Sequence, residues 1–315
     1  MRILFVKTSS LGDVIHHCPA VSDVRRRFPD ALIDWVVEEA FTGIVSMHPG
    51  VRRVIPVAVR RWRKRMLGPS TWREMLAFRH ALREDEYDFV IDTQGLLKSA
   101  LIASGARGVS NGFDSASARE SIASGLYAVR HAVSREMHAV ERNRALTAAA
   151  LGMGSGGACE YRLVSRGSNP VPLQMPFCVL LSMTSRAEKL WPEESWVELA
   201  RAIAARGWES VLPWGSEVEM ERCFRIAAAA GPGTVPRALS LEDIAAMMTH
   251  AKAVLGNDTG LAHLAVALGV PAIGLYCSSD PALTGLHGDG KLANLGGPGR
   301  LPSARDALAA LETLA

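Results

Sequence analysis

The chain has 315 residues, of which 48% are hydrophobic and 21% charged, which is the composition of a globular protein long enough for two domains. Its formal charge of +3 is too small to indicate a nucleic-acid partner by itself. No window approaches the roughly 20 apolar residues of a membrane-spanning helix, so we expect a soluble protein that is at most peripheral to a membrane.

Through the first half of the chain, short apolar runs alternate with stretches of helical period. Such runs are typical of strands buried on both faces of a sheet. The predicted strands are residues 3–7, 33–38, 54–59 and 89–92. The predicted helices are residues 14–27, 72–83 and 96–104. The interval 153–176 is rich in glycine, serine and proline and has little period, so we predict a linker there.

After the linker, the alternation of strands and helices starts again. The predicted strands are residues 177–183, 210–213, 253–255 and 271–276, and the predicted helices are residues 194–205, 219–230, 241–250 and 261–268. The tail 303–315 is apolar at helical spacing and is predicted to pack as a closing helix.

The repeated pattern predicts an α/β protein with two doubly wound parallel sheets. We place the domains at residues 1–165 and 166–315. Ligands of such sheets bind beyond the carboxyl ends of the strands, so two facing domains would hold one site in the cleft between them.

The first turn, VKTSSLGD at residues 6–13, follows the first predicted strand directly. It contains neither the dinucleotide fingerprint nor the P-loop motif. Asp13 stands at the start of a helical pattern, where a carboxylate is either an N-cap or, if it faces a cleft, a general base. A helix N-terminus lowers the pKa of such a carboxylate and weakens the base, which is tolerable if the proton moves late.

The segment GNDTGLAH at residues 256–263 is the corresponding turn of the second half, between an apolar run and a helical pattern. A strand that turns into a helix points free N–H groups and a positive dipole end at whatever lies there. Asp258, Thr259 and His263 add side chains that can bind an anion or a hydroxyl. An ordinary turn, with Asp258 or Thr259 as N-cap, is the alternative.

Two further turns of the second half carry charged residues. The segment SMTSRAEKLWP at 182–192 contains hydroxyls followed by Arg186 and Lys189, which suits a diphosphate, unless it is a solvated loop. The segment PWGSEVE at 213–219 brings Glu217 and Glu219 to a strand end, where carboxylates accept bonds from ribose hydroxyls or cap helices.

The basic run RRWRKR at residues 60–65 is the densest charge cluster of the chain. Such a run is often a solvated face, but arginine side chains match carboxylate and phosphate groups in a bidentate manner. We therefore interpret it as a site for a polyanionic partner at a membrane surface. Nucleic acid is the weaker interpretation, because no known nucleic-acid-binding module accompanies the run.

Cysteines and histidines give no indication of a metal site. The five cysteines are odd in number and widely scattered, which suits reduced thiols in a cytoplasmic protein. His16 and His17 are adjacent and so point to different helix faces, and no pair has ligand spacing. The acidic run 84–86 is better explained as a solvated loop. We expect neither a metal nor a cofactor.

Three segments together carry a resemblance to a known family. VKTSSLGD at 6–13, DTQGLLKS at 92–99 and GNDTGLAH at 256–263 resemble the ADP-heptose:lipopolysaccharide heptosyltransferases, and within them the type I branch that adds the first heptose. The resemblance spans nearly the whole chain, with the segments in the expected order and spacing. Each segment alone is a weak signal, and jointly they are specific.

The resemblance implies a GT-B fold and an inverting, metal-independent glycosyl transfer. The donor would be ADP-L-glycero-D-manno-heptose, bound mainly by the second domain. The acceptor would be the inner sugar acid, Kdo, of Kdo2-lipid A in lipopolysaccharide inner-core biosynthesis, bound mainly by the first domain. It also implies a location on the cytoplasmic face of the bacterial inner membrane, with peripheral electrostatic contact.

Site residues follow from the resemblance position by position. It implies that Asp13 is the catalytic base. The implied donor-binding residues are Thr184, Ser185, Lys189, Glu219, Asp258, Thr259, Gly260, Leu261 and His263. The implied acceptor-binding residues are Ser10, Gly12, Arg60, Arg61, Arg63 and Lys64. The alternatives are an enzyme that adds a later heptose, a sugar-nucleotide epimerase, which needs no basic patch, and an inactive nucleotide-binding module, which has no use for Asp13.

Overall fold

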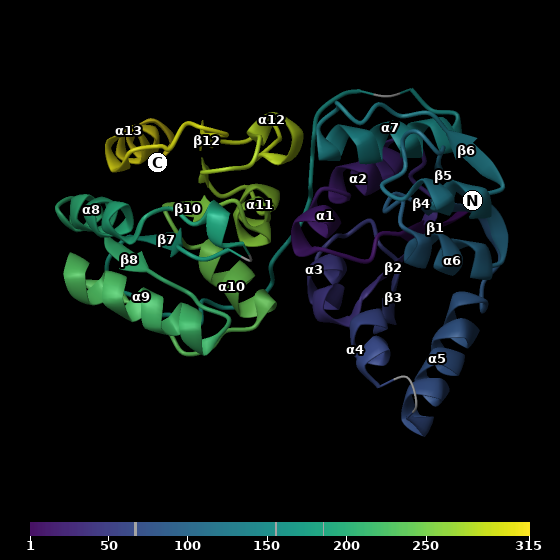
Figure 1. The fold of residues 1–315 in the computed structure, drawn as a ribbon, viewed down its shortest axis with the longest axis horizontal. Helices are drawn as coiled ribbons and strands as arrows, with labels where there is room; N and C mark the ends of the chain where they lie inside the picture. Colours follow the sequence, from purple (N-terminus) through teal and green to yellow (C-terminus); the bar gives the residue numbers. More distant parts are fainter. Residues whose placement is uncertain (66–67, 155, 185) are drawn as a thin grey trace. The chain divides into compact units, whose positions relative to one another are not determined.

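The computed structural model describes residues 1–65, 68–154, 156–184 and 186–315. The chain divides into two compact units, Met1–Leu163 and Val164–Ala315, where the sequence predicts a boundary after residue 165. In Figure 1 the first unit runs from purple to teal and the second from teal to yellow. Each unit consists of one sheet and its own helices.

The first unit contains one six-stranded parallel sheet. Its strands are β1 (Arg2–Val6), β2 (Leu32–Glu38), β3 (Arg53–Val57), β4 (Tyr87–Asp92), β5 (Gly108–Phe113) and β6 (Val129–His131). Its helices are α1 (Leu11–Ile15), α2 (Cys18–Arg27), α3 (Thr42–Ser46), α4 (Val59–Lys64), α5 (Pro69–Leu82), α6 (Leu97–Gly105) and α7 (Ala139–Leu151), with 3₁₀ turns η1 (Glu39–Phe41) and η2 (Ser121–Leu126). The strand order is β3-β2-β1-β4-β5-β6, which is the doubly wound order.

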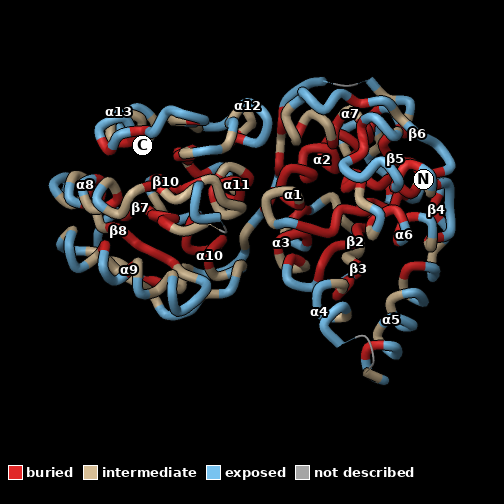
Figure 2. Tube along the Cα trace, in the orientation of Figure 1, coloured by how far each residue is buried: buried red, intermediate tan, exposed pale blue. Residues whose placement is uncertain are grey.

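Successive side chains of each strand point to opposite faces of this sheet, and both faces are buried. Leu4 and Val6 of β1 join a buried cluster with residues of α5, α6 and η2 on one face. Phe5 points to the other face, where its ring meets His17 at the start of α2, with a centroid distance of 4.5 Å. Figure 2 shows β2 as a buried segment within the unit. Burial on both faces explains why these strands read as continuous apolar runs.

The second unit repeats the same topology. Its strands are β7 (Phe177–Leu181), β8 (Glu209–Val211), β9 (Gly233–Thr234), β10 (Ala253–Asn257), β11 (Ala272–Tyr276) and β12 (Leu292–Gly296). Its helices are η3 (Ala187–Lys189), α8 (Glu193–Ala204), α9 (Glu217–Ala230), α10 (Leu241–Met248), α11 (Gly260–Ala267), α12 (Pro281–Thr284) and α13 (Ala304–Leu314). The strand order β12-β11-β10-β7-β8-β9 matches the first unit with β7 as the first strand and β10 as the fourth.

The core of the second unit is centred on two tryptophans. Trp191 and Trp196 are fully buried and meet edge to face at 5.0 Å, an arrangement that aromatic rings favour. The indole N–H of Trp191 donates to the carbonyl oxygen of Pro302 at 2.8 Å, so the segment before α13 is fastened to this core. The predicted closing helix is confirmed as α13.

Most predicted elements are confirmed, two differ in their bounds, and four strands were not predicted. The predicted helix 14–27 is two helices, α1 and α2, because the chain breaks at His16–His17 before Pro19 in the first turn of α2. The predicted strand 54–59 ends at Val57, and the basic run that follows this strand end lies mostly in helix α4. Edge strands β5, β6, β9 and β12 carry no strong apolar run and were not predicted.

The remaining sequence expectations concern thiols and membrane spans. All five cysteines are free thiols, as expected. Among the described residues, no helix has both the length and the apolar character that crossing a bilayer requires.

Candidate functional site

Gln94 connects the two central turns at the carboxyl edge of the first sheet. Strand β1 lies between β2 and β4, so the chain reverses its winding there and the turns after β1 and β4 are neighbours. Oε1 of Gln94 accepts the backbone N–H groups of Thr8 at 3.1 Å and Ser9 at 3.2 Å. Gln94 is only 2% exposed, so these bonds fix the turn from which the Asp13 helix starts.

A buried carboxylate supports Gln94 from below. Oδ1 of Asp92 accepts the backbone N–H of Gln94 at 2.7 Å, and Oδ2 accepts the hydroxyl of Tyr127 at 2.7 Å. Burial raises the pKa of Asp92, and the hydrogen bonds from Tyr127 and the turn, which lower the pKa, offset this rise only in part. Asp92 therefore has a positioning role for the turn.

Asp13 lies in the first turn of α1, where Ser10 and not Asp13 is the N-cap, and both oxygens of Asp13 are bonded. Oδ2 accepts the backbone N–H of Ser10 at 3.1 Å, which is the capping arrangement. Arg119 donates from one guanidinium nitrogen to Oδ1 at 2.6 Å and from the other to Oδ2 at 3.3 Å. Arg119 lies 106 positions away in the sequence, so nothing near Asp13 announces this partner.

Charge determines the protonation of Asp13. Burial raises its pKa, but the positive charges of Lys7 and Arg119 and the hydrogen bonds from Arg119 and Ser10 outweigh burial and lower the pKa below its ordinary value. The carboxylate is therefore ionised at neutral pH. Its basicity is low for as long as Arg119 stays on it.

Lys7 is buried beneath this turn, with an exposed fraction of 3%. Its ammonium donates to the carbonyl oxygen of Thr93 at 2.8 Å and to Oδ1 of Asn143 at 3.3 Å. Burial lowers the pKa of Lys7 to about 8, although Asp13 acts in the opposite direction. Lys7 and Gln94 both lie in motifs that the sequence indicated, but the sequence predicted no role for either residue.

Further cations gather around Asp13, one from the motif at 92–99 and others from segments outside the motifs. Lys98 donates to the hydroxyl of Ser9 at 3.1 Å. Arg142 is partly buried over the ring of Phe113, with its guanidinium carbon 4.9 Å from the ring centroid, and donates to the carbonyl oxygen of Ser117. Burial, and then the charges of Arg119 and Arg135, lower the pKa of Arg142. The neighbourhood of Asp13 thus has more positive than negative charge.

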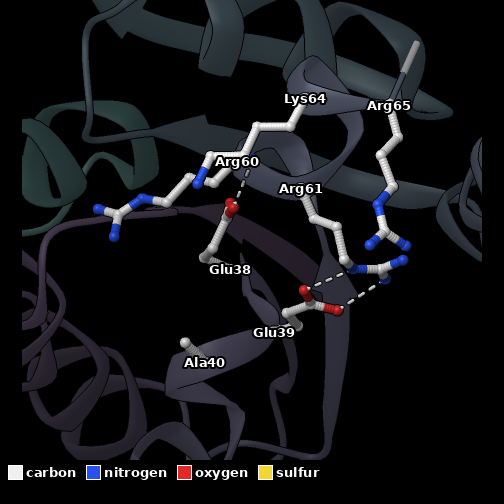
Figure 3. Close-up of a pocket in the computed structure, with 7 residues that line it drawn as sticks. All are labelled: Glu38, Glu39, Ala40, Arg60, Arg61, Lys64 and Arg65. Atoms are coloured by element: carbon white, nitrogen blue, oxygen red, sulfur yellow. Dashed lines mark hydrogen bonds and ion pairs between the residues drawn. The ribbon is translucent and has the colours of Figure 1, made fainter.

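The predicted basic patch lies on α4, and its members differ in their partners. Arg61 forms ion pairs with Glu39 at 2.9 Å and Glu74 at 2.8 Å. Its charge is thus already neutralised within the chain. Figure 3 shows the Arg61–Glu39 pair in a pocket that Arg60, Lys64 and Arg65 also line.

Arg60 contacts Glu38 through its backbone and Phe41 through its side chain. Its N–H donates to Oε1 of Glu38 at 2.8 Å, and its guanidinium carbon lies 5.8 Å from the ring centroid of Phe41. Among the described residues, no carboxylate lies within ion-pair distance of the Arg63 or Lys64 side chain. These two exposed residues, rather than Arg61, carry the charge that an anionic partner would meet.

In the second unit, the turns after β7 and β10 are neighbours at the corresponding edge of the sheet. The hydroxyl of Thr184 donates to the carbonyl oxygen of Asp258 at 2.9 Å. The ammonium of Lys189 is paired with Oδ2 of Asp258, which also accepts the hydroxyl of Ser279 at 2.6 Å. The structure therefore brings together three of the residues predicted for donor binding, and Ser279 is a fourth contact that the sequence did not indicate.

Helix α11 begins in the same turn. Thr259 is its N-cap and Gly260 its first residue, so its first N–H groups have no partner within the helix. Leu261 follows in the first turn, and His263 is 4% exposed. A helix start with a lysine beside it is a suitable place for phosphate oxygens.

Asn257 fastens this turn to the rest of the unit. Its Nδ2 donates to the carbonyl oxygen of Ser182 at 2.8 Å, and its Oδ1 accepts the backbone N–H of Trp191 at 3.0 Å. Ser182 and Trp191 bracket the segment that contains the predicted Ser185, which lies outside the described residues. Both ends of this loop are therefore held against β10.

Glu219 lies in the first turn of α9, just after the turn that follows β8, and one of its oxygens is already bonded. Oε2 accepts the backbone N–H of Gly215 at 2.7 Å, while the backbone N–H of Glu219 donates to Ser216, the N-cap of α9. The capping alternative, which concerned Glu217, is wrong, because Ser216 is the N-cap and Glu217 is the first residue of α9. Binding of a ribose hydroxyl by the remaining oxygen stays a prediction.

Comparison with known proteins identifies the family. A sequence profile described as Glycosyltransferase family 9 (heptosyltransferase) matches residues 75–305. The chain belongs to glycosyltransferase family 9. Lipopolysaccharide heptosyltransferase 1 of Escherichia coli K12 is 43% identical over 295 residues, which covers 93% of this chain and 92% of the relative. Lipopolysaccharide heptosyltransferase 2 of the same strain is 26% identical over 322 residues.

Solved structures of family 9 members share the whole fold. The E. coli heptosyltransferase WaaC with ADP superposes with a TM-score of 0.90 at 40% identity, covering 100% of both chains. The same enzyme with ADP-2-deoxy-2-fluoro heptose gives a TM-score of 0.86 at 39% identity, again covering 100% of both chains. The predictions of a GT-B fold with two doubly wound sheets and of a glycosyltransferase are thereby confirmed.

Proposed function

We propose that this glycosyltransferase moves L-glycero-D-manno-heptose from ADP-heptose to the inner Kdo of Kdo2-lipid A. The observation that carries the proposal is the 43% identity over 93% of the chain with lipopolysaccharide heptosyltransferase 1, against 26% with heptosyltransferase 2. The WaaC structures named for ADP and a fluorinated ADP-heptose support the same donor for this chain.

The geometry of the first unit suits activation of an acceptor hydroxyl. In the proposed step, the oxygen of the Kdo hydroxyl bonds to the anomeric carbon of heptose, and a carboxylate oxygen of Asp13 takes the proton of that hydroxyl. The bond between this carbon and the diphosphate breaks, and ADP leaves with the electron pair. Because the pKa of Asp13 is low, the proton moves late, when the bond to ADP is already largely broken.

The second unit supplies the charge that the leaving group needs. Lys189 and the start of α11 stabilise the negative charge that develops on the diphosphate, so the reaction proceeds without a metal ion in this proposal. Thr184, Thr259 and Gly260 orient the phosphates, and Asp258 and His263 contact the donor sugar. An attack from the face opposite ADP inverts the anomeric centre.

Contact with the lipid part of the acceptor is assigned to α4 and α5. Arg63 and Lys64 on α4 are exposed cations. Trp72 and Leu76 on α5 lie four residues apart, on one side of that helix, and are 57% and 64% exposed. Exposed aromatic and aliphatic side chains beside cations are typical of peripheral binding to an anionic lipid surface. Sedimentation with phosphatidylglycerol vesicles, against phosphatidylcholine vesicles, tests this contact.

The decisive experiment follows ADP release from ADP-heptose with Kdo2-lipid A as acceptor. The wild-type enzyme should release ADP only when that acceptor is present. Asp13→Ala should lower kcat by about 10²- to 10⁴-fold, the range for a general base, while ADP-heptose binding persists. Release with a heptosylated acceptor alone would reject the proposed acceptor. Near wild-type turnover of Asp13→Ala would reject the base.

A further inference from the structure

The two oxygens of Asp13 are not bound alike, and the difference points to a role for Arg119. Oδ2 accepts both the backbone N–H of Ser10 and a guanidinium nitrogen. For Oδ1 the structure gives one hydrogen-bond donor among the described residues, Arg119, at 2.6 Å. Removing Arg119 would therefore free Oδ1 while Ser10 continues to hold and orient the carboxylate through Oδ2.

Arg119 is placed so that it can leave. Its side chain is 43% exposed, whereas that of Asp13 is 15% exposed. It stands between β5 and η2, outside any helix or strand. An ion pair of this exposure has a small net stability, so a second carboxylate can compete for the guanidinium.

The surrounding charge favours such a competitor. Arg135 and Arg142 lie near enough to Arg119 to act on the same electrostatic neighbourhood. Nε of Arg142 is buried and has no hydrogen-bond partner among the described residues. A ligand that carries a carboxylate therefore enters a region of excess positive charge, whereas a neutral ligand gains nothing there.

We propose that Arg119 restrains the base and is drawn off Asp13 by the carboxylate of the acceptor sugar. This inference rests on the proposed function, because Kdo is a sugar acid and its carboxylate is the competitor. Before the exchange, both oxygens of Asp13 are occupied and the carboxylate is a poor base. After the exchange, Arg119 binds the acceptor, and Oδ1 of Asp13 is open to the acceptor hydroxyl. The correct acceptor thus activates the base that deprotonates it, and Arg119 is a positioning residue.

A comparison of two enzymes with two acceptors tests the exchange. The acceptors are a synthetic Kdo glycoside with a free carboxylate and its methyl ester, which cannot form the new ion pair. The enzymes are the wild type and Arg119→Gln. With the acid, Arg119→Gln should have a raised acceptor KM. With the ester, Arg119→Gln should be faster than the wild type in kcat/KM, by about fivefold or more, because the restraint on Asp13 is gone.

A role in binding alone predicts a different result. If Arg119 only binds the acceptor carboxylate, Arg119→Gln and the wild type are equally slow with the ester, and this outcome overturns the proposal. Arg135→Gln is the charge-matched control, because it removes a nearby cation without touching Asp13, and it should give no gain with the ester. Failure of the wild type with the acid would instead reject the proposed function.

A second variant keeps the test independent of folding. Arg119→Lys retains the charge but can bond only one carboxylate oxygen at a time, so its gain with the ester should lie between the wild type and Arg119→Gln. Binding of ADP, which concerns the second unit, should be unchanged in both variants and serves as the check that they are folded. If Arg119→Gln does not fold, no gain for Arg119→Lys overturns the proposal.

Discussion

Replacing Gln94 by leucine should loosen the turn that carries the proposed base. Leucine has about the volume of glutamine but lacks Oε1, which accepts the backbone N–H groups of Thr8 and Ser9. Gln94 is 2% exposed, Thr8 0% and Ser9 6%, so water does not readily replace the lost acceptor. Each buried N–H left without a partner costs about 1–3 kcal/mol, and the two together cost about 2–6 kcal/mol.

Hydrogen exchange of the peptide that spans residues 7–12 measures this cost directly. A loss of 2 kcal/mol in the local opening free energy corresponds to exchange that is faster by about 30-fold. The turnover rate should fall as well, because Ser10 and Asp13 follow the loosened turn. Gln94→Glu retains an oxygen acceptor and should keep the amides of Thr8 and Ser9 protected.

The control is Gln174→Leu, which makes the same chemical change at an exposed position of the second unit. It should leave exchange at residues 7–12 unaltered. Exchange in Gln94→Leu within about threefold of the wild type would refute the reasoning, because it would mean that other groups satisfy the two N–H donors.

Three further predictions concern charge. Lys189→Ala should weaken ADP-heptose binding by about 10- to 100-fold, as expected for the loss of charge-assisted hydrogen bonds. An unchanged affinity in titration calorimetry would contradict this prediction. Neutralising Arg63 and Lys64 together should raise the acceptor KM more than the donor KM. Arg61→Gln should raise the acceptor KM by a smaller factor, because Arg61 is already paired with Glu39 and Glu74. Equal rises of the acceptor KM in steady-state kinetics would contradict this difference. The pKa of Lys7 is about 8 in the folded chain against 10.5 ordinarily, so the unfolded chain binds the proton more tightly and stability rises by up to about 3 kcal/mol as pH increases through this window. The urea midpoint of the wild type should therefore increase from pH 7.5 to pH 10 by more than that of Lys7→Met does.

The central strands of both sheets were predictable because burial on both faces makes them apolar throughout. β1, β7 and β10 show this. Edge strands have no such signature: β5 contains two glycines and an asparagine, and β9 has two residues. Their places are decided by pairing with a neighbouring strand, and a single sequence does not display that pairing.

The site shows the same division between local and distant signals. Asp13 and the turn at Asp258 were predictable because a strand, a polar turn and a helix follow one another in the chain. Arg119 reaches Asp13 across 106 positions, through a loop without period or motif. The ion pairs of Arg61 with Glu39 of η1 and Glu74 of α5 likewise depend on how these elements lie around α4. The sequence therefore showed the charge of the run but not which charges are already neutralised.

Asn257 has a consequence for the entropy of donor binding. This fully buried side chain bonds the carbonyl of Ser182 and the N–H of Trp191, which bracket the loop carrying Thr184 and Lys189. The ends of that loop are thus ordered when the unit folds, at the expense of folding free energy and not of ligand binding. The second unit therefore offers a preorganised anchor, and ordering these loop ends takes nothing from the affinity for the nucleotide.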